Sequence, residues 1–288
     1  MELKSPLRFK KKGAIYFPTR SQIEVEIEVF GGNSGALNSE KFLISVASAW
    51  IKSGDFVMDV GANHGQHARL FAQMVGTNGR VLCFEADPFI CESLTKSAAD
   101  SLTPITVENV ALGDFEFGNE VLFYRHKLRD QEGSIFQRET SDKYESIAVA
   151  GRKLDDFVHE NLTFVKVDVE GAEYKILKGA KNILKLKSPL VGIELTRFPD
   201  LKMNYNPIDF LQILEELEYD IFNILGEQVT QEKWLDENFF MNHQNWLAKR
   251  GTFSHSFCMN QIPKLCRAFS WGATNNVPYP FKLIDFPS

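Results

Sequence analysis

The sequence contains few cysteines, and their spacing excludes the common cysteine-dependent folds. Only four are present in 288 residues, and none belongs to a Cys-x-x-Cys pair. This spacing fits neither a zinc finger nor the dense disulfide framework of a small secreted domain. Isolated cysteines of this kind are typical of reduced thiols in the cytosol. We therefore expect a cytoplasmic protein.

Long hydrophobic runs and an excess of positive charge are also missing. No apolar segment reaches the roughly 20 residues that a membrane-spanning helix needs, and no apolar stretch follows the basic cluster in residues 1–12 as in a signal peptide. The net charge of −6 and the pI near 5.6 disfavour a broad phosphate-neutralising surface. These absences predict a protein without a membrane span and without a nucleic-acid partner.

The composition is that of an ordinary globular protein, with 44% hydrophobic and 24% charged residues. The length allows one elaborated α/β domain, or a core with a smaller appendage. We divide the chain into an N-terminal extension (1–54), a ligand-binding core (55–230) and an aromatic-rich C-terminal extension (231–288). The last segment is expected to serve as a lid, as an oligomer contact or as packing at the far edge of the core.

Hydrophobic periodicity predicts the secondary structure of the first two segments. Strict alternation over Gln22–Phe30 predicts a half-buried strand, and Asn38 or Ser39 can cap a helix that includes Trp50. From Asp55 onward, short apolar runs alternate with helical stretches, which is the pattern of βαβ units around a parallel sheet. The expected core strands are 56–60, 80–85, 105–110, 164–169, 190–195 and 219–225, with helices over 172–186 and 208–217.

In the segment 57–65 the first expected strand enters a glycine-rich turn, and a helix follows. In open α/β sheets, ligands bind at the carboxyl ends of the strands, where glycine allows close approach and a helix N-terminus offers free amides. Glu85 follows Gly65 by twenty residues and ends the next strand, where a carboxylate can accept hydrogen bonds from both ribose hydroxyls. The pattern predicts a ligand that contains adenosine.

The residues of the turn favour S-adenosylmethionine over a dinucleotide. A dinucleotide fingerprint aligned on Gly61 has glycines where this chain has Asn63 and Gln66. The fingerprint glycine at the position of Asn63 is the one that makes room for the pyrophosphate. S-adenosylmethionine has no pyrophosphate, and Asn63 and the turn can supply donors for its carboxylate. A nicotinamide-dependent oxidoreductase or epimerase and a non-catalytic adenosine-binding module remain as alternatives.

Six short motifs, in this order and spacing, resemble the FkbM family of S-adenosylmethionine-dependent methyltransferases. The sequence Asp-Val-Glu-Gly-Ala-Glu at 168–173 is the most distinctive of them. Ala86 and Asp87 depart from the Pro-Asn that the family often has at these positions. The matching segments are 59–65, 84–88, 109–114, 153–157, 165–173 and 177–180.

The resemblance implies a fold, a cofactor and a reaction. The fold is a Rossmann-like class I methyltransferase fold, an α/β structure with a mainly parallel seven-stranded sheet that has one reversed strand and is flanked by helices. The cofactor is S-adenosyl-L-methionine, with S-adenosyl-L-homocysteine as product. Methyl transfer goes to a hydroxyl oxygen on a sugar or other natural product. We thus expect a small-molecule or carbohydrate acceptor, and we leave open a homo-oligomer.

The resemblance also implies a cofactor site along the first three strand ends. Gly61, Asn63 and Gly65 would line the methionine part, Glu85 the ribose, and residues 109–111 the adenine edge. Asp59 could hold the turn or reach the cofactor's ammonium through water. The expected cofactor-binding set is Asp59, Gly61, Ala62, Asn63, Gly65, Glu85, Ala86, Asn109, Val110, Ala111 and Asp168.

A hydroxyl acceptor must lose its proton, so we expect a general base near the strand ends. Asp168 is the best-placed candidate, followed by Glu170 and His64. Acidic residues such as Glu173 can instead favour the dipole of a following helix. Asp168, Glu170 and Glu194 could also gather a divalent cation, but our prediction is a site without a metal. The polar insertion Arg125–Tyr144 is expected to be mobile and, with the C-terminal aromatics, to shape the acceptor pocket.

Overall fold

Seven strands form the central sheet in the computed structural model, which describes residues 40–99, 101–129, 132–137, 143–157, 161–195, 206–223, 228–235 and 245–254. Their order is β3-β2-β1-β7-β8-β10-β9. All neighbouring pairs are parallel except those of β10, which runs antiparallel to both β8 and β9. The expected mainly parallel sheet with one reversed strand is therefore confirmed. The bounds are β1 Phe56–Val60, β2 Arg80–Phe84, β3 Ile105–Glu108, β7 Leu162–Val167, β8 Leu190–Glu194, β9 Asp220–Asn223 and β10 Asn245–Lys249.

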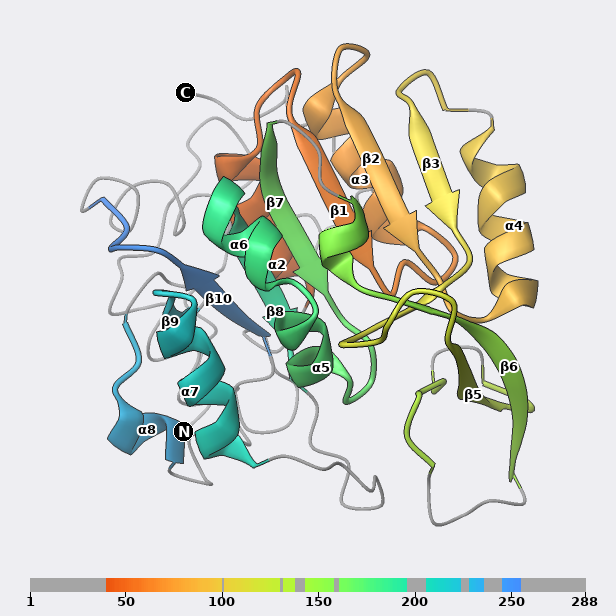
Figure 1. Ribbon diagram of the computed structural model, residues 1–288. Coiled ribbons are helices and arrows are strands. Elements are labelled where there is room, and N and C mark those ends of the chain that lie inside the picture. Colours follow the sequence, from red (N-terminus) through yellow and green to blue (C-terminus); the bar gives the residue numbers. More distant parts are fainter. Residues whose placement is uncertain are drawn as a thin grey trace, which may run out of the picture.

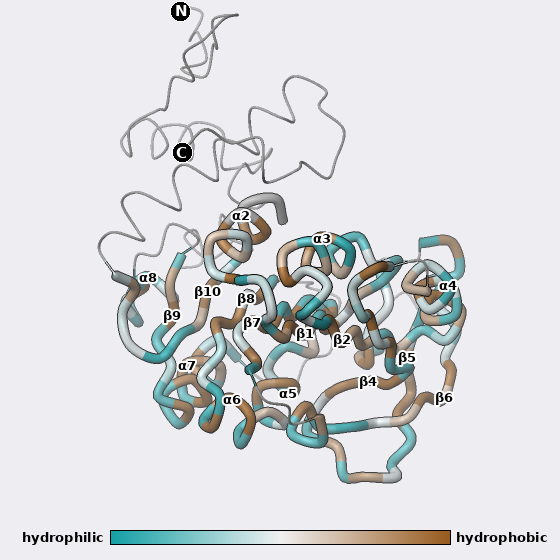
Figure 2. Tube along the Cα trace, turned by 90° about the horizontal axis from the view of Figure 1, so that it is seen from above, coloured by the Kyte–Doolittle hydropathy of each residue, from teal (hydrophilic) through white to brown (hydrophobic). Residues whose placement is uncertain are grey.

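Helices cover both faces of the sheet (Figures 1 and 2). One face carries α2 (Glu40–Trp50), α3 (Gln66–Val75) and α4 (Pro88–Ala98), and the other carries α5 (Glu173–Lys178), α6 (Lys181–Lys187) and α7 (Pro207–Glu216). A short helix, α8 (Gln231–Leu235), packs against α7. Among the described residues, no helix is long and apolar enough to cross a membrane.

The central strands are apolar because both of their faces are covered. All five residues of β1 are buried. Val57 belongs to the core beneath α2 and α3, whereas its neighbour Met58 belongs to the core beneath α5, α6 and α7. Alternate side chains of each strand thus fill two separate cores, and the sheet edge at the strand ends is left for a site.

The sheet extends past residue 230, where the sequence analysis ended the core. Strand β10 lies between β8 and β9 and is the reversed strand of the sheet. This boundary needs correction, because β8 and β9 each pair with β10 and removal of the segment 231–288 would therefore separate β9 from the rest of the sheet. The five-residue stretch Asn245–Lys249 is short and lies among dense aromatics, so its pattern alone does not distinguish a strand from other buried chain.

The described aromatic residues of the C-terminal segment belong to the core. Trp234 stacks on Phe210 of α7 with ring centroids 5.6 Å apart and meets Trp246 of β10 edge-on at 5.0 Å. Phe253 packs edge-on against Trp50 of α2. These contacts agree with the expectation that the aromatics close the far edge of the sheet. The expected strand Gln22–Phe30 and the aromatics after residue 254 lie outside the described residues.

The helix expected over 172–186 is two helices, α5 and α6, that meet at Gly179. A Cβ at Gly179 would lie 2.0 Å from the carbonyl oxygen of Gly113, so the two backbones touch here. The carboxylate of Asp155 also begins α6, since it accepts hydrogen bonds from the amides of Asn182 and Ile183. A close backbone contact and a cap from a distant residue therefore divide the helix.

Between β3 and β7 the chain forms a second sheet with the order β4-β6-β5. Its strands are β4 (Ala111–Leu112), β5 (Glu120–His126) and β6 (Tyr144–Arg152), and β5 and β6 form an antiparallel hairpin. Figure 1 shows this hairpin beyond the arrowheads of β2 and β3. Paired strands thus extend into both ends of the stretch Arg125–Tyr144. Part of that stretch lies outside the described residues, and its mobility stays a prediction.

The contact between Gly179 and Gly113 predicts a costly substitution. Gly179→Ala should lower the free energy of unfolding by about 1–3 kcal/mol, because the new methyl group must displace the backbone of Gly113. Urea denaturation measures this change. The control is Leu186→Ala on α6, whose side chain is 69% exposed and whose loss should cost less than about 0.5 kcal/mol. Equal effects of the two substitutions would contradict the contact.

Candidate active site

A cavity of about 370 Å³ opens at the carboxyl ends of β1, β2, β7 and β8. Its size falls in the range of about 300–1,000 Å³ that is usual for small-molecule sites. It brings together most of the residues predicted from the sequence, from four separate segments of the chain. Asp59, Gly65 and Asn109 do not line it. The predicted residues that do are Gly61, Ala62, Asn63, His64, Glu85, Ala86, Val110, Ala111, Asp168 and Glu170.

The turn after β1 uses all of its own backbone amides. The amides of residues 61 and 62 both donate to the carbonyl of Phe84, and that of Asn63 donates to Glu85 Oε2 at 2.8 Å. His64 N donates to the Asn63 side chain, and Gly65 N donates to the carbonyl of residue 62. A pyrophosphate on this turn would need such amides. The turn over residues 61–65 therefore has no free amide to offer a pyrophosphate.

The same hydrogen bonds correct one expectation about the cofactor. We expected the turn to supply amides for the cofactor's carboxylate, and its amides are already bonded. The first turn of α3 follows directly, with Gly65 as its N-cap and without a side-chain cap. Its amides are therefore the nearest backbone donors.

Close packing against neighbouring segments requires glycine, without a side chain, at positions 61 and 65. Both have a positive φ, near +78°. A Cβ at Gly61 would lie 1.8 Å from the backbone oxygen of Asp168, and one at Gly65 would lie 2.4 Å from a methyl group of Leu94. The glycines let the turn touch the loop after β7 on one side and α4 on the other. They thus fix the position of the turn, of which Gly61 lines the cavity.

Glu85 links the turn to the start of α4. Its Oε2 accepts from Asn63 N and its Oε1 accepts from Asp87 N at 2.9 Å. The residue is only 7% exposed. Burial raises the pKa of Glu85 to about 7, although the two amide hydrogen bonds act in the opposite direction. Each carboxylate oxygen keeps a second lone pair, so Glu85 can still accept from a ligand in the cavity.

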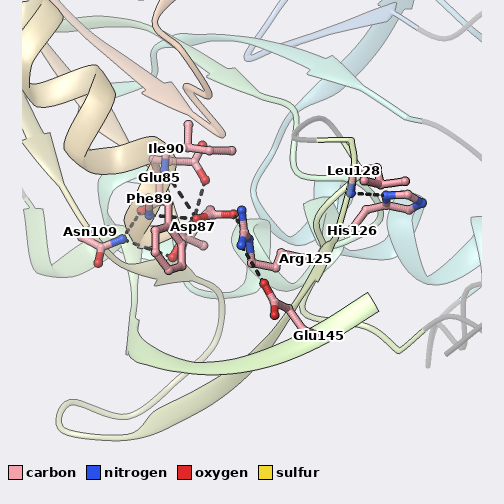
Figure 3. Close-up of polar contacts among 10 residues, drawn as sticks. Glu85, Asp87, Phe89, Ile90, Asn109, Arg125, His126, Leu128 and Glu145 are labelled. Carbon is pink, nitrogen blue, oxygen red and sulfur yellow. Dashed lines mark hydrogen bonds and ion pairs between the residues drawn. The ribbon is translucent and has the colours of Figure 1, made fainter. Parts of the chain in front are cut away.

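Asn109 and Asp59 are not among the residues that line the cavity. The side-chain amide of Asn109 donates to the carbonyls of Glu85 and Ala86 at 2.8 and 3.1 Å, which fixes the loop after β2 (Figure 3). Asp59 is fully buried within β1. In this structure Asn109 shapes the site rather than lining it, and the walls near it are Val110 and Ala111.

A buried lysine lies beside the predicted base. Lys166 in β7 is 1% exposed, and its Nζ donates to Asp168 Oδ2 at 2.7 Å. Both residues line the cavity together with Glu170 and Glu194. The sequence analysis missed Lys166, although a lysine within the apolar run Val165–Val169 was a usable signal. This end of the cavity therefore combines carboxylates, which accept hydrogen bonds, with the positive charge of Lys166.

Glu173 faces away from the cavity. Its Oε1 accepts from the amides of Val169 and Gly171, and its Oε2 accepts no hydrogen bond among the described residues. Burial raises the pKa of Glu173 to about 7. The carboxyl group therefore fixes the loop after β7 at an electrostatic cost, whereas the sequence analysis considered a role at the dipole of the following helix.

The family follows from comparison with known proteins. The model of the methyltransferase FkbM domain matches residues 59–221, more than half of the 288 residues. The chain belongs to the FkbM methyltransferase family. The chain therefore carries a methyltransferase domain of class I fold, whose family uses S-adenosylmethionine, and the oxidoreductase alternative is not retained.

Individual relatives of this methyltransferase are distant. It is 34% identical over 70 residues to protein-L-isoaspartate O-methyltransferase of Methanococcus aeolicus, a match that covers 23% of this chain and 32% of that protein. An FkbM methyltransferase structure from Methylobacillus flagellatus aligns with a TM-score of 0.42 and 20% identity over 68% of this chain and 44% of its own. A putative rRNA methylase structure from Clostridium thermocellum aligns with a TM-score of 0.45 and 13% identity, covering 74% and 94%.

The carboxylates of the cavity raise the question whether the site could hold a metal ion. Among the residues that the structure describes, no group of three or more His, Cys, Asp or Glu side chains is placed to hold a metal ion. The carboxylates of Asp168, Glu170 and Glu194 all line the cavity.

The raised pKa of Glu173 predicts a pH-dependent stability. The folded protein holds this proton up to about pH 7, whereas the unfolded chain releases it near 4.5. The resulting stabilisation is complete below about pH 4.5 and is lost as the pH rises through 7. Glu173→Gln stays neutral, so its advantage over the wild type in unfolding free energy should grow by about 1–3 kcal/mol between pH 4.5 and 8.

Urea denaturation at the two pH values measures this difference. Glu232→Gln on the exposed side of α8 is the matched control, because it removes the same charge from the surface. A constant difference between Glu173→Gln and wild type across this range would contradict the buried, proton-binding carboxyl group.

Proposed function

We propose that this methyltransferase transfers the methyl group of S-adenosylmethionine to a hydroxyl oxygen of a small-molecule or carbohydrate acceptor. The observation that carries the proposal is the ion pair between Lys166 and Asp168 in the cavity. Asp168 is partly exposed, with 19% of its side-chain area accessible, while its partner is buried. A carboxylate held in this way is oriented toward incoming substrate.

The cavity divides into two chemically different ends. Phe84, Ala86, Val110, Ala111 and Phe123 form an apolar end next to Glu85. Lys166, Asp168, Glu170 and Glu194 form a polar end. A nucleoside fits the first end, since its flat base needs apolar walls and its ribose hydroxyls can donate to Glu85. The polar end is then left for the acceptor.

When bound, the cofactor supplies an electrophilic methyl group on a sulfonium whose leaving group is a neutral thioether. The protein must then align the acceptor oxygen and exclude water. In our proposal Asp168 accepts the hydroxyl proton as general base. Lys166 keeps the carboxylate in place through Oδ2, and among the described residues Oδ1 accepts no other hydrogen bond.

The carboxylates of the polar end support an acceptor with several hydroxyl groups. Glu170 and Glu194 line the same end as Asp168, and a carboxylate only accepts hydrogen bonds when ionised. A polyhydroxylated molecule such as a sugar offers several donors at once. His64, which is exposed at the same cavity, is the second candidate for the proton transfer.

The ribose assignment predicts a loss of cofactor affinity on substitution of Glu85. Glu85→Ala should weaken the binding of S-adenosylhomocysteine by roughly 1–3 kcal/mol, because the ribose hydroxyls lose their acceptor. Calorimetric titration measures the dissociation constant, and Glu108→Ala at the end of β3, outside the cavity lining, is the control. Unchanged affinity in Glu85→Ala would remove the ribose assignment.

The base assignment predicts a loss of turnover without loss of cofactor affinity. On an acceptor found in a panel of sugars and other hydroxyl compounds with methyl-labelled cofactor, Asp168→Asn should lower kcat by about 10²- to 10⁴-fold. The dissociation constant for S-adenosylhomocysteine should stay within about twofold. Methyl transfer to nitrogen, sulfur or carbon acceptors alone would contradict the proposed hydroxyl chemistry.

A further inference from the structure

The β5–β6 hairpin forms one wall of the cavity. Phe123 of β5 lines the cavity together with Gly133 and Ile135, which follow the hairpin strand in the chain. Phe123 is 8% exposed and packs in one cluster with Ala111 and Val149, against which Ala86 also packs. The hairpin thus contacts the apolar end of the cavity directly, beside the loops after β2 and β3.

Gly133 is shaped to fit the Phe123 ring. A Cβ at Gly133 would lie 2.4 Å from Cζ and 2.9 Å from Cε1 of that ring. Gly133 therefore packs so closely against the ring that a side chain at this position would displace it. A bridge between Tyr124 and Ser134, with hydrogen bonds of 2.8 and 3.0 Å, keeps this segment next to β5.

Two contacts hold the hairpin against the rest of the site. Arg125 Nε lies 2.7 Å from Asp87 Oδ2 and its Nη1 lies 2.6 Å from Glu145 Oε1, while its guanidinium covers the ring of Phe89 at 4.6 Å (Figure 3). Asp87 caps α4 and donates its amide to Glu85. The hairpin is therefore tied to the residue that we assign to the ribose.

The second contact lies on the other side of the cavity. Ser134 is buried, and its Oγ donates to the backbone carbonyl of Glu170 at 2.9 Å. Phe123 is thus held between a contact to α4 and a contact to the loop after β7. An aromatic ring that is fixed at both sides needs little reordering when a ligand arrives, which favours binding.

We propose that Phe123 is the aromatic wall against which the adenine of S-adenosylmethionine stacks. The base would lie at the apolar end of the cavity, against the face of this ring that lines it and beside the small residues Ala86 and Ala111. Glu85 stands next to this space, where the ribose attached to that base would meet it. The cofactor would then be enclosed partly by the insertion and not by the central sheet alone.

Titration of the full chain with S-adenosylhomocysteine and with adenosine tests the proposal. Stacking of a base on an aromatic side chain is worth about 1–3 kcal/mol, and every 1.4 kcal/mol is tenfold. Phe123→Leu, which keeps an apolar side chain of similar bulk, should raise both dissociation constants by about 5- to 100-fold. Phe123→Tyr should keep both within about twofold. Adenosine is included because it carries only the base and the ribose.

Leu122→Ala is the matched control, since Leu122 neighbours Phe123 on the same strand and is 52% exposed. It should change neither dissociation constant, and the thermal midpoints of all variants should show that they fold. Unchanged affinities in Phe123→Leu would overturn the adenine wall and assign the ring to the acceptor side. Failure of the wild type to bind S-adenosylhomocysteine would instead contradict the cofactor itself, so the two failures are distinguishable.

Discussion

The site depends on one buried carboxylate. Glu85 accepts the amide of Asn63 from the turn after β1 and the amide of Asp87 from the start of α4. These two bonds join the ends of the first two strands into one rigid edge, and they hold the charged form of a group that burial disfavours. Asp87 extends the connection to Arg125 of the insertion. The turn after β1, the start of α4 and the insertion are thereby linked through Glu85 and Asp87, and Figure 3 shows the contact of Asp87 with Arg125.

The same arrangement limits which ligands the edge can hold. Because the turn over residues 61–65 spends its amides on protein acceptors, no cradle for a pyrophosphate remains there. In our proposal, adenosine recognition comes from Glu85 and from the apolar walls. This physical constraint agrees with the family of the chain, which uses a cofactor without phosphate. It also explains why an insertion that contributes an aromatic wall would be useful.

Several motif residues support the site without touching the cavity. Asp155 caps α6, Gly179 touches the backbone of Gly113, and Glu173 fixes the loop that carries Asp168. A cap, a close backbone contact and a loop support each tolerate little change in side-chain size or chemistry. Short motifs of this kind therefore report the geometry around a site as much as its chemistry.

The sequence alone determined the strands β1, β2 and β8 to within a residue, the glycine turn, and the placement of Glu85 and Asp168 at strand ends on the same edge of the sheet. Burial on both faces and turn chemistry are local signals, so the sequence carries them. Only the tertiary structure decided the rest. The reversed strand β10, the break at Gly179 and the ion pair of Lys166 arise from contacts between segments far apart in the chain. The position of Phe123 in the cavity wall also depends on contacts between distant segments. Whether an apolar residue of an inserted hairpin lines a cavity depends on where the hairpin docks, and local periodicity does not specify that.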